Sequence, residues 1–269
     1  MRADNDSARP VDSAPSAEAH PPMPFFIESL GQEDTRRPRM EIGLGIWTAG
    51  TRRYNPVDRI RERGEALIDE LDGRSLLYVD PTGGAEAFEG LAGPDLVLIT
   101  DVHGDHMDAE TLQAVVTPET EIVAPAAVVE ELPEALAAQA RTLANGEETM
   151  LLGLNVEAIP MYNLTEERLQ YHEEGRGNGY VVTMGGTRVY IAGDTEDIPE
   201  MRQLEDIDVA FVPFNLPFTM TAEQAADAVL AFEPDIVYPY HYRGSDVDEF
   251  ARLVTDGNPD IEVRRGEWY

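Results

Sequence analysis

Apolar residues in this chain gather into short runs that turn-forming residues separate. Runs of about four to eight apolar residues bounded by Gly, Pro, Asn or Asp predict buried strands. Such runs occupy residues 75–81, 95–100, 121–125, 155–159, 179–184, 187–192, 208–213 and 235–240. The turn signals Asp72-Gly73 and Gly185-Gly186 predict that two of these runs belong to β-hairpins.

Apolar residues at helical spacing follow several of these runs. Helices are predicted over residues 109–116, 126–143 and 247–254. Pro133 interrupts the second of them. Thr221 and Gln224 have the spacing of a capping box at the start of a further helix. Hairpins followed by alternating strands and helices in each half predict two mixed sheets packed together, with helices outside.

The strand at residues 95–100 ends in a cluster of polar residues. Four potential metal ligands lie within six residues: Asp101, His103, Asp105 and His106. Asp101 and His103 face the same side if the strand geometry continues, because side chains alternate along a strand. Burying so many polar groups without partners costs several kcal/mol each, so the cluster favours a metal site. The alternative is a polar turn that caps the helix beginning near Ala109.

The chain has five histidines, and most of them follow predicted strands. His20 lies near the start of the chain, whereas His172 and His241 each end or follow a strand, as the two histidines of the cluster do. A single histidine in such a place is more often a hydrogen-bonded structural residue than a ligand. Four of them together, with Asp194 after another strand, favour a metal centre.

Residues 100–106, Thr-Asp-Val-His-Gly-Asp-His, resemble the Thr-His-x-His-x-Asp-His motif that marks the metallo-β-lactamase superfamily. Asp101 stands where the family has its first histidine, and Gly64 stands where a histidine often precedes the first strand of the hairpin. The resemblance covers roughly residues 40–269. It implies a four-layer αββα metallo-β-lactamase sandwich of the α/β (α+β) class.

The resemblance also implies a set of metal ligands. Site one comprises Asp101 in the first histidine's place, His103, His172 and Asp194. Site two comprises Asp105, His106, Asp194 and His241. Asp194 would bridge the two metals, and Asp105 and His106 would take part in catalysis. Because the loop at residues 163–178 is polar, a solvated surface histidine is the alternative for His172.

Such a centre implies two divalent metal ions about 3.5–4 Å apart, which share a water, lower its pKa toward about 7 and so hold a metal-bound hydroxide. Imidazole suits Zn²⁺, whereas added carboxylates move the preference toward Mn²⁺ or Fe²⁺. The chain has no cysteine, which excludes thiolate ligands and disulfides.

The sequence therefore predicts a metal-dependent hydrolase that acts on a small ester, lactone or phosphodiester. Residues 193–201, 213–215 and 239–242 are most similar to the ascorbate-6-phosphate lactonase branch of the superfamily. Arg243 is a candidate for binding an anionic substrate group, although pairing with Asp246 or Asp248 explains it equally well. The open alternatives are a nuclease or phospholipase-type phosphodiesterase of the same fold, and a non-catalytic metal-binding or sensor protein.

The charge of the chain bears on its environment and partners. Its 20 basic residues, all arginine, face 52 acidic ones, which gives a formal net charge of −32. The acidic excess is spread along the chain and favours halophilic adaptation to a salt-rich cytoplasm, where counter-ions screen it. Binding of nucleic acid requires a basic surface, and no run of consecutive basic residues is longer than two arginines, so a small-molecule substrate is expected.

Residues 1–35 are predicted to form a disordered tail, because the start of the chain is rich in Ala, Pro, Ser and Asp. Residues 36–269 are predicted to form the metal-binding domain. No apolar run has the length of a membrane span, and the start contains no apolar core of a signal peptide. A cytoplasmic location is therefore expected, and the oligomeric state stays open.

We expect folding stability to rise as KCl increases from about 0.1 to about 2 M, because salt shortens the Debye length and strengthens apolar burial. Thermal unfolding followed by circular dichroism measures this effect. A melting temperature that stays constant across that range would contradict adaptation to salt.

Overall fold

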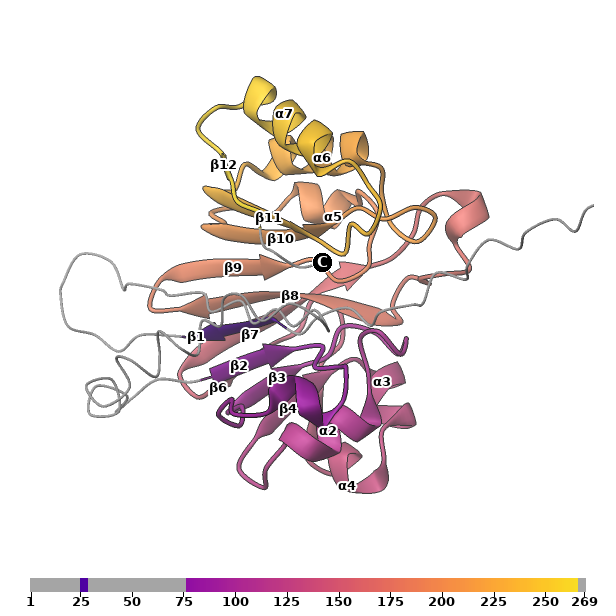
Figure 1. Ribbon diagram of the computed structural model, residues 1–269, viewed down its shortest axis with the longest axis vertical. Helices are drawn as coiled ribbons and strands as arrows, with labels where there is room; N and C mark the ends of the chain where they lie inside the picture. Colours follow the sequence, from indigo (N-terminus) through magenta and orange to yellow (C-terminus); the bar gives the residue numbers. More distant parts are fainter. Residues whose placement is uncertain (1–24, 29–75, 266–269) are drawn as a thin grey trace, which may run out of the picture.

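The computed structural model of this 269-residue chain describes residues 25–28 and 76–265, in which two β-sheets lie between two sets of helices (Figure 1). One sheet has five strands in the order β1-β2-β3-β4-β5. The other has seven strands in the order β12-β11-β10-β9-β8-β7-β6. Each sheet mixes parallel and antiparallel pairs.

The five-stranded sheet is built mainly from parallel strands. Its members are β1 (Phe25–Glu28), β2 (Leu76–Val79), β3 (Leu96–Leu98), β4 (Glu121–Ala124) and β5 (Ala140–Thr142). β1 pairs with β2 in the antiparallel sense, and the remaining pairs are parallel. The carboxyl ends of β2, β3 and β4 therefore meet at one edge of the sheet.

The seven-stranded sheet begins as an antiparallel meander and continues as a parallel sheet. Its members are β6 (Glu148–Leu151), β7 (Leu154–Met161), β8 (Gly177–Met184), β9 (Thr187–Ile191), β10 (Val209–Pro213), β11 (Ile236–Tyr240) and β12 (Glu262–Val263). The pairs from β6 to β9 are antiparallel, and those from β9 to β12 are parallel.

Helices cover the outer face of each sheet, and Figure 1 shows the two sets at opposite ends of the molecule. The five-stranded sheet carries the 3-10 helix η1 (Ala85–Phe88) and the helices α2 (Ala109–Val115), α3 (Ala126–Glu131) and α4 (Glu134–Ala137). The seven-stranded sheet carries α5 (Pro199–Arg202), α6 (Ala222–Phe232) and α7 (Val247–Gly257). A second 3-10 helix, η2 (Glu166–Arg168), lies in the loop between β7 and β8. Leu112, Met201 and Phe250 are fully buried between helix and sheet.

Alternation along the strands assigns each side chain to one boundary between layers. In β2, Leu77 and Val79 belong to the core between the sheets, while Tyr78 packs on the helix side. In β8, Tyr180 and Val182 also lie between the sheets. Full burial of such a side chain is worth roughly 1.5–3 kcal/mol, so the apolar pattern determines which face of each strand points inward.

The prediction of two mixed sheets with helices outside is confirmed. The capping box is also present: the Thr221 hydroxyl accepts from the Gln224 amide at 3.1 Å, and the Gln224 side-chain oxygen accepts from the Thr221 amide at 3.1 Å. These two bonds satisfy donors that the first turn of α6 would otherwise leave unpaired.

The structure differs from the helix predicted over residues 126–143. Pro133 ends α3, and α4 lasts only one turn before the chain extends into β5, whose backbone pairs with β4. β6, β12 and α5 were not predicted, because they are short and two of the four residues of β6 are exposed.

One short segment of the predicted tail at residues 1–35 is described, and the tail itself stays a prediction. Phe25–Glu28 lies within that range and forms β1, which pairs with β2. Composition cannot reveal this pairing, because the partner strand is distant in the sequence. The rest of the range, the turn at residues 72–73 and Gly64 lie outside the described residues.

The two sheets meet through close backbone contacts at one end of β8. The Asn178 amide donates to the Thr100 carbonyl at 2.9 Å, which joins the seven-stranded sheet to the end of β3. Two glycines permit the approach: a Cβ at Gly177 would lie 3.0 Å from the Thr100 carbonyl oxygen, and one at Gly179 would lie 2.8 Å from that of Ala192. The loops that follow β3 and β9 are thereby brought together.

We expect Gly179→Ala to lower the free energy of unfolding by about 1–3 kcal/mol, because the added methyl group overpacks against backbone atoms. Gly93→Ala is the matched control, since the nearest atom to a Cβ there lies at 3.5 Å. Urea unfolding at constant salt measures both variants. Equal stability of the two would show that β8 and β9 adjust freely at this point.

Candidate metal centre

The loop after β3 carries the first four predicted ligands. Asp101 and His106 are buried, whereas the side chains of His103 and Asp105 are 42% and 40% exposed. The His106 and Met107 amides donate to the His103 carbonyl at 2.9 and 2.8 Å, which closes the loop into a tight turn. The loop thus presents two ligands to the interior and two toward solvent.

The helix that follows has its own cap. Asp108 accepts hydrogen bonds from the amides of Glu110 and Thr111 at the start of α2. The four residues of the cluster are therefore not needed as a helix cap, which removes the main reason for interpreting them as a polar turn.

Three further predicted ligands come from the seven-stranded sheet and its loops. His172 lies in the loop between β7 and β8, Asp194 follows β9, and His241 directly follows β11; all three are buried. His241 has a φ of 47°, in the left-handed region. Such a conformation costs about 1–3 kcal/mol for a non-glycine residue and clusters at functional sites.

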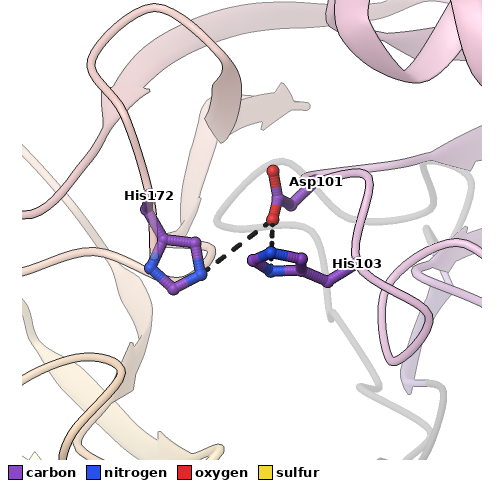
Figure 2. Close-up of side chains that lie close together, drawn as sticks. All are labelled: Asp101, His103 and His172. Carbon is purple, nitrogen blue, oxygen red and sulfur yellow. Dashed lines mark ion pairs between the residues drawn. The ribbon is translucent and has the colours of Figure 1, made fainter. Parts of the chain in front are cut away.

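Six of these side chains form two groups. Within each group, the candidate ligand atoms lie within 4.8 Å of one another. The first group is Asp101, His103 and His172, and the second is Asp105, His106 and His241. Figure 2 shows the first group, in which the Asp101 carboxylate points toward both imidazoles. Its Oδ2 lies 2.8 Å from His103 Nδ1 and 3.9 Å from His172 Nε2.

Asp194 lies between the two groups. Its Oδ2 is 3.5 Å from His172 Nε2 in the first group, and 3.4 and 3.5 Å from His106 Nε2 and His241 Nε2 in the second. One carboxylate oxygen therefore approaches histidines of both groups. The structure brings all seven predicted ligands to one place, and Asp194 holds the position of a bridge.

Several buried atoms of this centre have no hydrogen-bond partner among the described residues. They include Nε2 of His106, Nε2 of His172 and Oδ1 of Asp194. An unsatisfied buried polar atom costs about 1–3 kcal/mol. A set of imidazole nitrogens and carboxylate oxygens with this geometry fits a divalent ion such as Zn²⁺, Mn²⁺ or Fe²⁺.

Asp80 orients His106 and was not singled out from the sequence. Its Oδ2 lies 2.8 Å from His106 Nδ1, and its two oxygens accept from the Thr100 amide at 2.8 Å and the Thr100 hydroxyl at 2.6 Å. This leaves Nε2 of His106 to face the centre, the arrangement in which a carboxylate fixes a metal-binding imidazole. The sequence feature that could have pointed to Asp80 is its place before Pro81, directly after β2.

Asn163 performs the same task for His172. Its side-chain oxygen lies 2.7 Å from His172 Nδ1, and its amide nitrogen donates to Glu196 Oε1 at 3.1 Å and to the Phe218 carbonyl at 2.8 Å. These bonds hold the imidazole with Nε2 toward Asp194. His172 is therefore a buried, oriented residue rather than the solvated one that its polar loop allowed.

Burial and opposite charges shift pKa values within the centre. Burial alone would raise the pKa of Asp194, but His241, His106 and His172 hold that pKa far below its usual range. Burial opposes a charge on His106, yet Asp194 and Asp80 raise its pKa well above the usual value. The centre therefore keeps an ionised carboxylate at its middle, as coordination of a cation requires.

Arg176 pairs with Asp101 and was also missed from the sequence. Its Nε donates to Asp101 Oδ1 at 3.1 Å, and its Nη2 donates to Oδ2 at 2.9 Å. Burial would raise the pKa of Asp101, but hydrogen bonding and charge from His103, with the bonds from Arg176, lower it to about 2. No local pattern connects two residues that are 75 positions apart.

Arg243 is exposed, two residues beyond His241. Its position is compatible with the predicted contact to an anionic group, which stays a prediction. No helix in the described part of the chain is long and apolar enough to cross a membrane.

Comparison with known proteins places these features in a family. The model of the Beta-lactamase superfamily domain matches residues 77–242. A metal-dependent hydrolase from Methanopyrus kandleri is 32% identical over 226 residues, covering 76% of this chain and 95% of the relative. Another from Thermococcus onnurineus is 30% identical over 222 residues, covering 78% and 97%.

A solved structure from Parabacteroides distasonis, described as a metal-dependent hydrolase, is 42% identical. It covers 72% of this chain and 86% of its own, with a TM-score of 0.65. The range of the family model, residues 77–242, contains Asp101, Asp194 and His241, and the two-sheet fold agrees with the solved relative. The chain therefore belongs to the metallo-β-lactamase superfamily.

Proposed function

We propose that this protein is a metal-dependent hydrolase that cleaves a small ester, lactone or phosphodiester. The observation that carries the proposal is the position of Asp194, whose Oδ2 lies 3.4–3.5 Å from histidines of both ligand groups. A bridging carboxylate between two sets of ligands is the arrangement that supports two-metal hydrolysis. The names of the relatives agree with it.

Different residues of the proposed centre have different roles. Asp194 holds both halves of the centre together, Asp80 orients His106, and Asn163 orients His172. When bound, divalent metals supply a Lewis acid and a water of lowered pKa. Because three of the seven ligands are carboxylates, Mn²⁺ and Fe²⁺ compete with Zn²⁺ for the site.

Solvent reaches the centre over the loop after β3. His103 and Asp105 are the half-exposed ligands, and the other five are buried. We infer that the scissile group of the substrate enters from this side. A reachable edge beside buried candidate ligands provides the access that catalysis on a substrate requires.

Apolar side chains favour a small substrate over a polyanionic one. Six large apolar side chains are exposed among the described residues, and four of them, Leu164, Leu169, Leu216 and Phe218, lie on the loops after β7 and β10. Asn163 joins these loops through the Phe218 carbonyl and also contacts His172. With a net charge of −32, this surface suits an ester or lactone with an apolar group better than a nucleic acid.

The resemblance of residues 193–201 to the ascorbate-6-phosphate lactonase branch supports a lactone as one substrate class. The spread of acidic charge supports a salt-rich cytoplasm as the working environment.

The experiment that tests the function is a screen of lactones, esters and phosphodiesters with Zn²⁺ or Mn²⁺, run alongside elemental analysis of the purified protein. We expect Asp194→Ala to lose metal and turnover together while circular dichroism shows a folded protein, because both metals lose one ligand. Asp197→Asn, three residues further on, is the control that removes a carboxylate outside the centre. Full metal content and normal turnover in Asp194→Ala would overturn the assignment.

A second prediction concerns Asp80. We expect Asp80→Asn to weaken metal binding by about 10–100-fold, because His106 loses the carboxylate that orients it. Competition with a chelator measures the affinity. Asp95→Asn is the control: it removes a carboxylate at the opposite end of β3, where Asp95 accepts from the Leu76 amide. Unchanged affinity in Asp80→Asn would show that His106 is held by other contacts.

A further inference from the structure

Asp101, which stands where the family motif has its first histidine, is paired with a second residue, Arg176. Asp101 is fully buried, and its carboxylate faces His103 and His172 in the first ligand group (Figure 2). A carboxylate in the place of a neutral imidazole adds one negative charge to a centre that already contains Asp194. A buried charge of this kind requires compensation.

Arg176 supplies that compensation. Nε and Nη2 of its guanidinium bind the two oxygens of Asp101, and the Tyr171 carbonyl accepts from Nη2 at 2.6 Å. The backbone carbonyl fixes the direction of the arginine. Nη2 also lies 3.5 Å from Nε2 of His103, so the guanidinium lies next to two members of the first ligand group.

The pairing leaves Asp101 able to act as a ligand. Each carboxylate oxygen has two lone pairs, and a bidentate arginine uses one on each. The second lone pair on Oδ2 faces His103 Nδ1 at 2.8 Å, where it accepts a hydrogen bond that a bound metal would replace. The pair as a whole is neutral, as an unprotonated histidine is.

We propose that Asp101 and Arg176 replace the first histidine of the motif as a unit. Asp101 supplies the ligand oxygen of site one, and Arg176 is a positioning residue that orients this carboxylate and cancels its charge. This inference rests on the proposed metal centre and adds that the two residues depend on each other.

The pairing of Asp101 with Arg176 changes the Zn²⁺ affinity that we expect for Asp101→His. The family resemblance alone suggests that Asp101→His restores a better Zn²⁺ site. With Arg176 in place, however, the new histidine stands beside a cation that has lost its partner, and that cation repels the metal. Asp101→His should therefore weaken site one, and removal of Arg176 should restore it.

The test is a double-mutant cycle read out by Zn²⁺ titration against a chelator, which gives the stoichiometry and the two affinities. We expect Asp101→His to weaken the first site about tenfold or more, in the range known for lost metal-site partners. Asp101→His/Arg176→Gln should bind more tightly than Asp101→His. Arg176→Gln alone should bind Zn²⁺ at the first site more weakly than the natural protein, because Asp101 loses the group that orients its carboxylate.

A matched control tests whether loss of any arginine has the same effect. Arg252 forms an equivalent fork with Glu249 on the surface of α7. Asp101→His/Arg252→Gln should therefore bind as weakly as Asp101→His. If Asp101→His does not fold, Asp101→Asn keeps the shape of the side chain and carries the same expectation in the same cycle.

The visible spectrum of bound Co²⁺ provides an independent readout, because it depends on the ligand atoms. It should change at site one between the natural protein and Asp101→His/Arg176→Gln. The proposal is overturned if the double variant binds no better than Asp101→His, or if Asp101→His binds as tightly as the natural protein. A natural protein that binds no divalent metal would instead overturn the proposed function itself.

Discussion

The contact between β8 and the end of β3 is the constraint on which the metal centre depends. The Asn178 amide binds the Thr100 carbonyl, and the Tyr180 hydroxyl donates to the Ile99 carbonyl at 2.8 Å. The loop after β3 supplies ligands from the five-stranded sheet, whereas Asp194 and His241 come from the seven-stranded one. If the sheets were farther apart at this edge, the two sets of ligands could not share one carboxylate.

Two residues, Asp80 and Asn163, orient imidazoles of the candidate centre. Asp80 directly follows β2 and contacts His106 at the edge of one sheet, while Asn163 contacts His172 and Glu196 beside the other. These two imidazoles are therefore held in orientation by residues of their own sheet before any metal binds. Such preorganisation limits the entropy that metal binding must overcome.

Much of the fold follows from the sequence, because period-two burial and the capping box of α6 are local patterns. β5 escapes this reasoning, since Ala140–Thr142 is short and partly exposed, and only its pairing with β4 makes it a strand. Most candidate ligands were visible because they follow a strand, whereas His172 was found through the family resemblance. Arg176 was not, because its partner Asp101 is far away in the sequence and the pair exists only once both sheets have formed.

Gly104 has a consequence for how this enzyme family diversifies. It lies between His103 and Asp105, the half-exposed ligands, and a Cβ at this position would meet nothing within 4 Å. Its φ is not in the left-handed region, so other residues fit the same backbone. A side chain at this position would project beside the edge from which we propose that the substrate enters, while every candidate ligand stays in place. On that proposal, a single codon change can alter the substrate range independently of the metal chemistry.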